Sequence, residues 1–105
     1  MEILGYRQKL QNASTGGNGT ALQTYGYTRE NTFYITPTTG VSTGAIQIET
    51  ADESTFAGAW APLGPEINLS TGSAIVNHTG AIRAVRARIS SNVAGGTVTI
   101  MAVGN

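Results

Sequence analysis

The side chains with the clearest capacity for binding chemistry are three arginines in one short segment, AIRAVRARIS, at positions 83, 86 and 88. The chain of 105 residues holds six lysines and arginines, so this segment carries half of its basic side chains. A guanidinium group presents a planar fork of N–H donors that suits carboxylate and carbonyl oxygens. The segment therefore predicts docking on an acidic or carbonyl-rich surface, or alternatively a solvated ladder that blocks strand pairing.

The other residues that could do chemistry do not form a catalytic pattern. His78 is the only histidine, and the chain has no cysteine, so nothing in the sequence pairs with it as a metal ligand or a catalytic base. It is expected in a turn, NHTG. Asp52 and Glu53 are adjacent, so on an extended segment they point in opposite directions and cannot flank one glycosidic bond. The sequence predicts a protein that is not an enzyme and that uses no cofactor or metal.

The composition narrows the classes of partner. Charged residues make up 11% of the chain and the formal net charge is zero, whereas an average domain is about 25% charged. Nucleic acid is an unsuitable partner, because phosphate binding requires a basic excess. The chain has no apolar run long enough for a signal peptide or a membrane span, so we expect synthesis in a cytoplasm and no membrane partner. The polar, uncharged surface suits protein or carbohydrate.

Short β-favouring runs separated by turn residues follow residue 20. Their number and spacing predict an all-β fold, an antiparallel β-sandwich of jelly-roll or immunoglobulin-like type with about seven to eight strands. The expected domain occupies residues 20–105. The runs are residues 21–28, 31–36, 44–50, 66–70, 73–77, 81–90 and 97–103.

Alternation within these runs assigns side chains to faces. Ile46 and Ile48 share one parity with Gln47 and Glu49 opposite, which indicates one apolar face and one wet face. In the arginine segment, Val85, Ala87 and Ile89 should point inward, which leaves Arg86 and Arg88 on the outer face. We expect Glu49 to be their partner across the strands. Arg83 has the inward parity, so it should lie at the mouth of the strand or be re-aimed by a bulge.

Residues 1–19 are expected to be an arm with a glycine-rich joint. Residues 1–12 combine apolar and charged side chains, and the following ASTGGNG permits unusual backbone angles. A helix over residues 3–10 and a frayed terminus without a role are the alternatives. The side chains expected to anchor the arm to a partner are Ile3, Leu4, Tyr6, Arg7, Lys9 and Leu10.

Trp60 and two uncharged strands raise separate questions. In FAGAWAPLG, Trp60 is either a lid over the open end of the sandwich or a platform for a sugar, and neighbouring Pro62 and Leu63 favour the lid. The runs SAIVN and TVTIMAV lack charges, and a free edge on either would promote aggregation. Self-association would bury such edges.

Several of these motifs recur in the same order in a known group of proteins. Over residues 43–100 the chain is similar to small β-sandwich proteins of tailed bacteriophage particles, often capsid decoration or cement proteins. A galactose-binding jelly roll of the discoidin kind is the second resemblance. The motifs are Gln47-Ile48-Glu49, Gly58-Ala59-Trp60, Pro62-Leu63-Gly64, Ala84-Val85-Arg86-Ala87-Arg88-Ile89 and Gly95-Gly96-Thr97-Val98-Thr99.

The phage resemblance implies a structural role on the capsid surface of a virion. Such a protein binds the major capsid protein across capsomer joints, commonly as a homotrimer, with terminal arms reaching over the shell. Arg86 and Arg88 would join the arm residues in capsid or subunit contacts. The alternatives are a carbohydrate-binding module of a phage adsorption apparatus and a tail or neck component.

Overall fold

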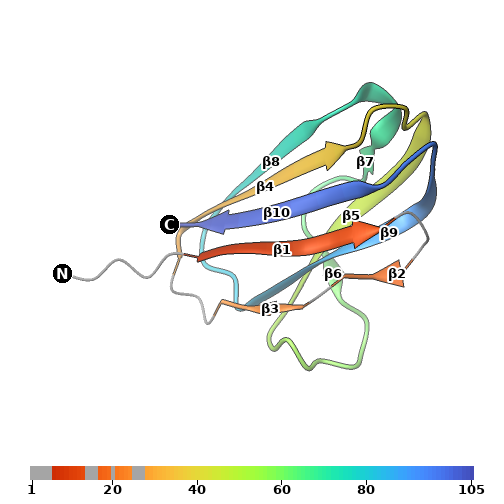
Figure 1. Cartoon of the computed structure of the whole chain (residues 1–105). Coiled ribbons are helices and arrows are strands. Elements are labelled where there is room, and N and C mark those ends of the chain that lie inside the picture. Colours follow the sequence, from red (N-terminus) through yellow and green to blue (C-terminus); the bar gives the residue numbers. More distant parts are fainter. Residues whose placement is uncertain (1–5, 14–16, 20, 25–27) are drawn as a thin grey trace.

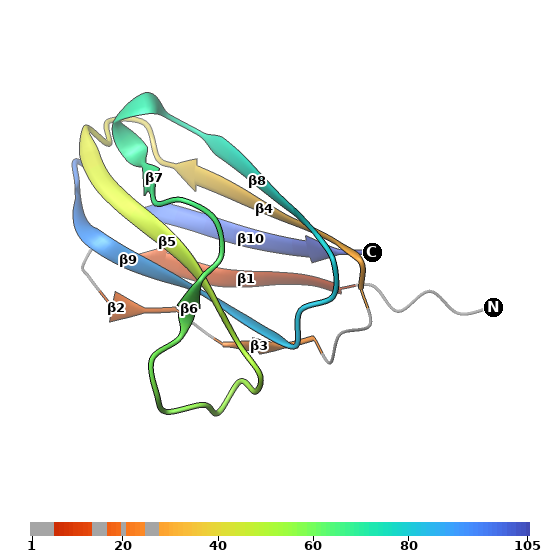
Figure 2. The same cartoon turned by 180° about the vertical axis from the view of Figure 1, so that it is seen from behind.

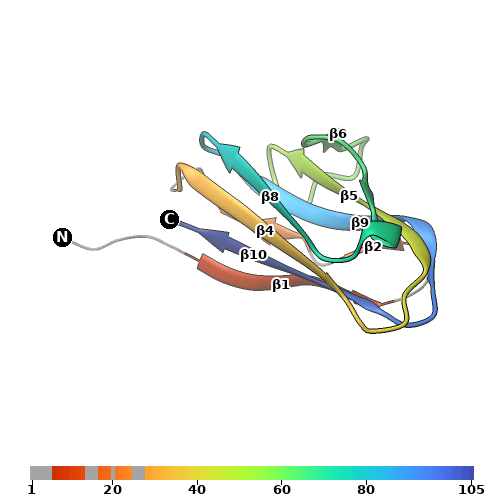
Figure 3. The same cartoon turned by 90° about the horizontal axis from the view of Figure 1, so that it is seen from above.

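A computed structural model describes residues 6–13, 17–19, 21–24 and 28–105. Within these residues the chain forms two antiparallel sheets that pack face to face (Figures 1 and 3). The two layers are plain in Figure 3, where β1, β10, β4 and β8 lie on one side and β9 and β5 on the other. The predicted all-β sandwich is confirmed.

The first sheet contains four of the described strands. Strands that are adjacent in this sheet are not consecutive in the sequence, because β10 lies between β1 and β4. In spatial order the strands are β1 (Tyr6–Ala13), β10 (Val98–Gly104), β4 (Glu30–Pro37) and β8 (Ala74–Thr79).

The second sheet is built on two long strands with short segments at its margins (Figure 2). The central pair is β5 (Thr43–Ala51) with β9 (Ala84–Ala94). The two-residue strands β2 and β3 pair with β9, and β6 and β7 pair with β5. Their bounds are Gly17–Asn18, Leu22–Gln23, Ala61–Pro62 and Ile67–Asn68, and a 3₁₀ turn, η1, covers Leu69–Thr71.

The core lies between the two sheets, where side chains of one parity from each long strand meet. Phe33 and Ile35 from β4 face Ile46 and Ile48 from β5, and all four are buried. Burying a side chain of this size stabilises the folded state by about 2 kcal/mol. The inward assignments of Val85, Ala87 and Ile89 are confirmed as well, and Val98 and Ile100 of β10 are also buried.

The expected N-terminal arm is wrong for residues 6–13. They form β1, which pairs with β10 along its length, and they are neither an arm nor a helix. Leu10 is 1% exposed and belongs to the core. The physical reason is that β1 covers one edge of the uncharged β10 while β4 covers the other, so the chain itself protects the TVTIMAV run. Ile3 and Leu4 lie outside the described residues.

Other boundaries also differ from the expectation. Residues 66–70 give a two-residue strand and then the 3₁₀ turn, rather than one strand. His78 lies within β8 and not in a turn. β9 begins at Ala84, so Arg83 lies at the mouth of the strand. This is one of the two positions that we expected for it. Of the run 21–28, Leu22 and Gln23 form β3, and residues 25–27 lie outside the described part.

Replacing Leu10 by alanine tests whether β1 belongs to the core. We expect the free energy of unfolding to fall by about 3 kcal/mol, because a buried leucine is lost and a cavity remains. Urea denaturation followed by circular dichroism measures it. Thr36→Ala, an exposed change on β4, is the control and should change stability by less than about 0.5 kcal/mol. An unchanged urea midpoint for Leu10→Ala would contradict a core position for β1 and would support the N-terminal arm.

Candidate functional site

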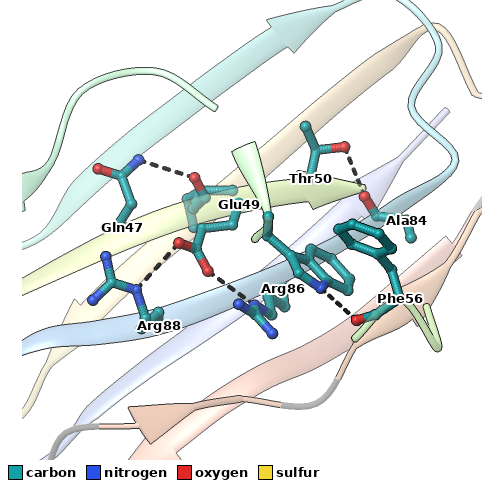
Figure 4. Close-up of polar contacts among 9 residues, drawn as sticks. Gln47, Glu49, Thr50, Phe56, Ala84, Arg86 and Arg88 are labelled. Atoms are coloured by element: carbon teal, nitrogen blue, oxygen red, sulfur yellow. Dashed lines mark hydrogen bonds and ion pairs between the residues drawn. The ribbon is translucent and has the colours of Figure 1, made fainter. Parts of the chain in front are cut away.

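The arginines of β9 meet a single carboxylate on the outer face of the second sheet (Figure 4). The strand register places Glu49 of β5 opposite Arg86 and Gln47 opposite Arg88. Nε of Arg86 donates to Oε1 of Glu49 at 2.9 Å, and Nε of Arg88 donates to Oε2 at 3.2 Å. The predicted pairing of Glu49 with both arginines is confirmed.

This face of the sheet is not the wet face that alternation indicated. The side chain of Glu49 is 9% exposed and that of Arg86 is 17% exposed, whereas that of Arg88 remains 40% exposed. The segment that follows β5, residues 52–66, folds back over the sheet and contains β6; we call it the covering loop (Figure 2). Because the loop excludes water, a charge beneath it requires a partner.

Trp60 of the covering loop is the side chain that closes over Arg86. Its ring centre lies 4.4 Å from the Cζ atom of Arg86, a stacking distance for a guanidinium on an indole. Its Nε1 donates to the carbonyl oxygen of Phe56 at 2.9 Å. Trp60 is therefore a lid, but over Arg86 and not over the open end of the sandwich. With its ring buried, it offers no open platform for a sugar.

Backbone and amide hydrogen bonds fasten the covering loop to β5. The backbone N–H of Leu63 donates to the carbonyl of Ile48 at 2.7 Å. Nε2 of Gln47 donates to the carbonyl of Gly64 at 3.1 Å. These bonds hold the second half of the loop against β5, beside the ion pairs of Glu49.

The first half of the loop is held at its start by the third arginine. Nε of Arg83 lies 2.9 Å from a carboxylate oxygen of Asp52, and both side chains are largely exposed. An exposed pair of this kind contributes about 0–1 kcal/mol. Phe56, between the two anchors, is the large apolar side chain that the loop leaves exposed. The loop thus presents an aromatic side chain on a fixed backbone.

The predicted site residues do not form one surface. Arg86 and Arg88 lie on the second sheet, whereas Tyr6, Arg7, Lys9 and Leu10 belong to β1 of the first sheet. Leu10 is in the core and cannot reach a partner.

Sequence reasoning missed two features that the structure adds. Gln47 was assigned to a wet face and instead anchors the covering loop. Tyr34 and Ile75 are large, exposed and directly opposite one another on the first sheet. The parity of Tyr34 against Phe33 and Ile35 was the available signal for that exposed face.

Among residues 6–13, 17–19, 21–24 and 28–105, no three His, Asp or Glu side chains gather into a group able to hold a metal ion. None of the helical segments in this described part has the length and hydropathy to cross a membrane. The side chain of Arg88 is 40% exposed while its Nε holds Glu49, so the guanidinium has exposed surface with which to bind a carboxylate or carbonyl.

Comparison with known proteins identifies the fold. No protein-family model and no curated protein sequence matches the chain. The solved structure of the SPBc2 prophage-derived protein YomS is similar, with a TM-score of 0.72 at 15% identity, and the match covers 95% of this chain and 91% of that one. A capsular polysaccharide assembling protein, CapF from Staphylococcus aureus, matches with a TM-score of 0.34 over 22% of its own chain, too weak to carry an argument. The likeness to YomS establishes the sandwich topology.

Replacing Glu49 by glutamine tests whether this carboxylate stabilises the second sheet. We expect a loss of about 3 kcal/mol in the free energy of unfolding, because a mostly buried guanidinium is left without its counter-charge. Chemical denaturation monitored by Trp60 fluorescence measures it.

The matched control is Asp52→Asn, which removes the carboxylate of the exposed ion pair with Arg83. It should cost no more than about 1 kcal/mol. Equal losses for the two variants would show that burial of Glu49 has no special energetic consequence.

Proposed function

We propose that the chain is a structural protein of a phage particle, a decoration or cement protein that binds the outer surface of the capsid and stabilises the shell across capsomer joints. The observation that supports this most is the fold likeness to a prophage-derived protein over nearly the whole of both chains. The motifs of residues 43–100 support the decoration role specifically. The major capsid protein is the proposed partner, and a homotrimer is the proposed unit.

The contact that we assign to the capsid lies on the second sheet. It combines the exposed side chain of Phe56 with the partly exposed side chain of Arg88, on a loop and strand tied together through Glu49 and Trp60. Aromatic and arginine side chains are enriched at protein interfaces, and a surface that is ordered before binding loses little entropy on association. These properties suit a protein that binds the outer surface of a capsid.

The charge distribution fits a protein partner better than nucleic acid. Arg83, Arg86 and Arg88 each contact a carboxylate of the chain itself. The net charge is zero, and counterion release from phosphates requires an uncompensated basic surface. We therefore propose a binding role without catalysis, without a cofactor and without nucleic acid or membrane as partner.

A tail or neck component of the particle is the second candidate, because the same fold likeness supports it. A carbohydrate-binding module has less support, since Phe33, Tyr34 and Trp60 do not converge on one open surface. Phe33 is in the core, Tyr34 is on the outer face of the first sheet, and Trp60 is buried on the second. A sugar platform needs such rings side by side on one open surface.

Cryo-electron microscopy of the particle that carries the chain tests the proposed location. We expect density for the sandwich on the outside of the capsid, with the second sheet and its covering loop facing the shell. Density confined to the neck or to the tail tip, or no density on the particle, would contradict the decoration role.

A substitution of Arg88 tests the proposed contact surface. Arg88→Ala should weaken binding to capsids lacking the protein by about tenfold, which corresponds to roughly 1.4 kcal/mol for the loss of a charged hydrogen bond at an interface. Co-sedimentation of the purified chain with such capsids measures the affinity. Arg83→Ala is the matched control, an exposed arginine at the strand mouth, and should bind as the unaltered chain does. Equal affinities for all three would exclude Arg88 from the contact.

A further inference from the structure

The first sheet ends in a strand whose outer edge carries no protection. Among the described residues β8 pairs with β4 alone. Its pairing runs from Glu30 opposite Thr79 to Ile35 opposite Ala74 without a bulge. Residues 67–82 contain no acidic residue, lysine, arginine or proline. Charges, prolines and bulges are the usual means by which an edge strand avoids a second partner, and β8 has none of them.

The opposite end of the same sheet provides an internal contrast. β1 has a register shift between Lys9 and Gln11, and Lys9 is an exposed charge there. The backbone of Gly19 lies against the carbonyl of Leu10 in this strand. The second sheet ends in strands of two residues each. Of the long strands described, β8 is therefore the one with a straight, neutral and open edge.

An apolar row on the outer face leads to this edge. Met101 of β10 is opposite Tyr34 of β4, and Tyr34 is opposite Ile75 of β8. Tyr34 is 44% exposed and Ile75 is 60% exposed. Within β8, Ile75, Asn77 and Thr79 point outward, whereas Ala74, Val76 and His78 are half-buried on the inner side. The row ends at the last strand of the sheet, so a further strand added there would lie directly beside Ile75.

We propose that β8 pairs antiparallel with β8 of a second copy of this chain, so that two four-stranded sheets become one continuous sheet. A neutral edge cannot select a partner by charge, but it suits an identical neutral edge. A two-fold axis between two antiparallel copies of one strand gives every residue the same contact in both chains and closes the assembly. Both copies of Ile75 then lie on the same face, and the two apolar rows meet.

This contact does not depend on the capsid and does not rest on the proposed function. It also differs from a three-fold contact, because a two-fold axis joins units in pairs. If other surfaces hold the chain as a trimer whose three-fold axis meets the β8 two-fold axis at a right angle, β8 pairing gives six copies, and if the chain forms no trimer, it gives two. In both of these closed arrangements the contact doubles the mass of the assembly in solution.

Light scattering coupled to size-exclusion chromatography tests the pairing on the full chain, at several protein concentrations. Ile75→Lys and Asn77→Lys each place a charge on the outer face of β8, and both positions are exposed. We expect either change to halve the measured mass. The matched control is Thr36→Lys, which places the same charge on the same face but on β4, and it should keep the mass of the unaltered chain.

Circular dichroism of each variant establishes that the fold is intact. Asn77→Lys replaces one exposed polar side chain by another, so it keeps the test valid if Ile75→Lys disturbs folding. An unaltered chain with the same mass as both β8 variants would overturn the pairing. So would a Thr36→Lys variant that loses mass as the β8 variants do, because the effect would then follow added charge and not the edge.

Discussion

The carboxylate of Glu49 is the group on which the arrangement of the second sheet depends. It lies under the covering loop with little exposure, where an unpaired charge would cost several kcal/mol. Arg86 and Arg88, two residues apart on the adjacent strand, each give it one N–H. The indole of Trp60 then packs on Arg86 and closes the site from above. The ion pairs and the loop stabilise each other, because the loop keeps water away and the charges fix where the loop can lie.

This arrangement makes the two outer faces of the sandwich different. The face of the second sheet is filled by the chain's own covering loop, so a partner meets Phe56 and the outer part of Arg88. The face of the first sheet has no such cover among the described residues and exposes Tyr34 and Ile75. One molecule therefore has a surface with an exposed aromatic ring and an arginine on one side, and an apolar row with an open strand edge on the other. The two contacts that we propose, one with a shell and one with a second copy of the chain, use these two different faces.

Much of the interior could be predicted from alternation, because side chains of one parity in a strand must face the same side. The same rule placed Glu49 on the same face of the sheet as Arg86 and Arg88. The covering loop could not be predicted, since residues 52–66 have no period that reveals which face they fold over. β1 was missed because Leu10 follows charged residues and precedes a glycine-rich stretch. The sequence showed that TVTIMAV and SAIVN are both uncharged, but it did not show which of them lies at a sheet edge. Strand order alone decides that β10 is central and β8 is at the edge.

The central claim is that one buried carboxylate holds the covering loop on the sheet. Amide hydrogen exchange of the unaltered chain and of Glu49→Gln, compared segment by segment, tests it most directly. The claim predicts that residues 60–64 exchange much faster in the variant, because Trp60 and Leu63 lose their fixed position, while β10 in the other sheet keeps its protection. Unchanged exchange at residues 60–64 would contradict it. The order of the loop would then come from the hydrogen bonds that Leu63 donates to Ile48 and that the carbonyl of Gly64 accepts from Gln47.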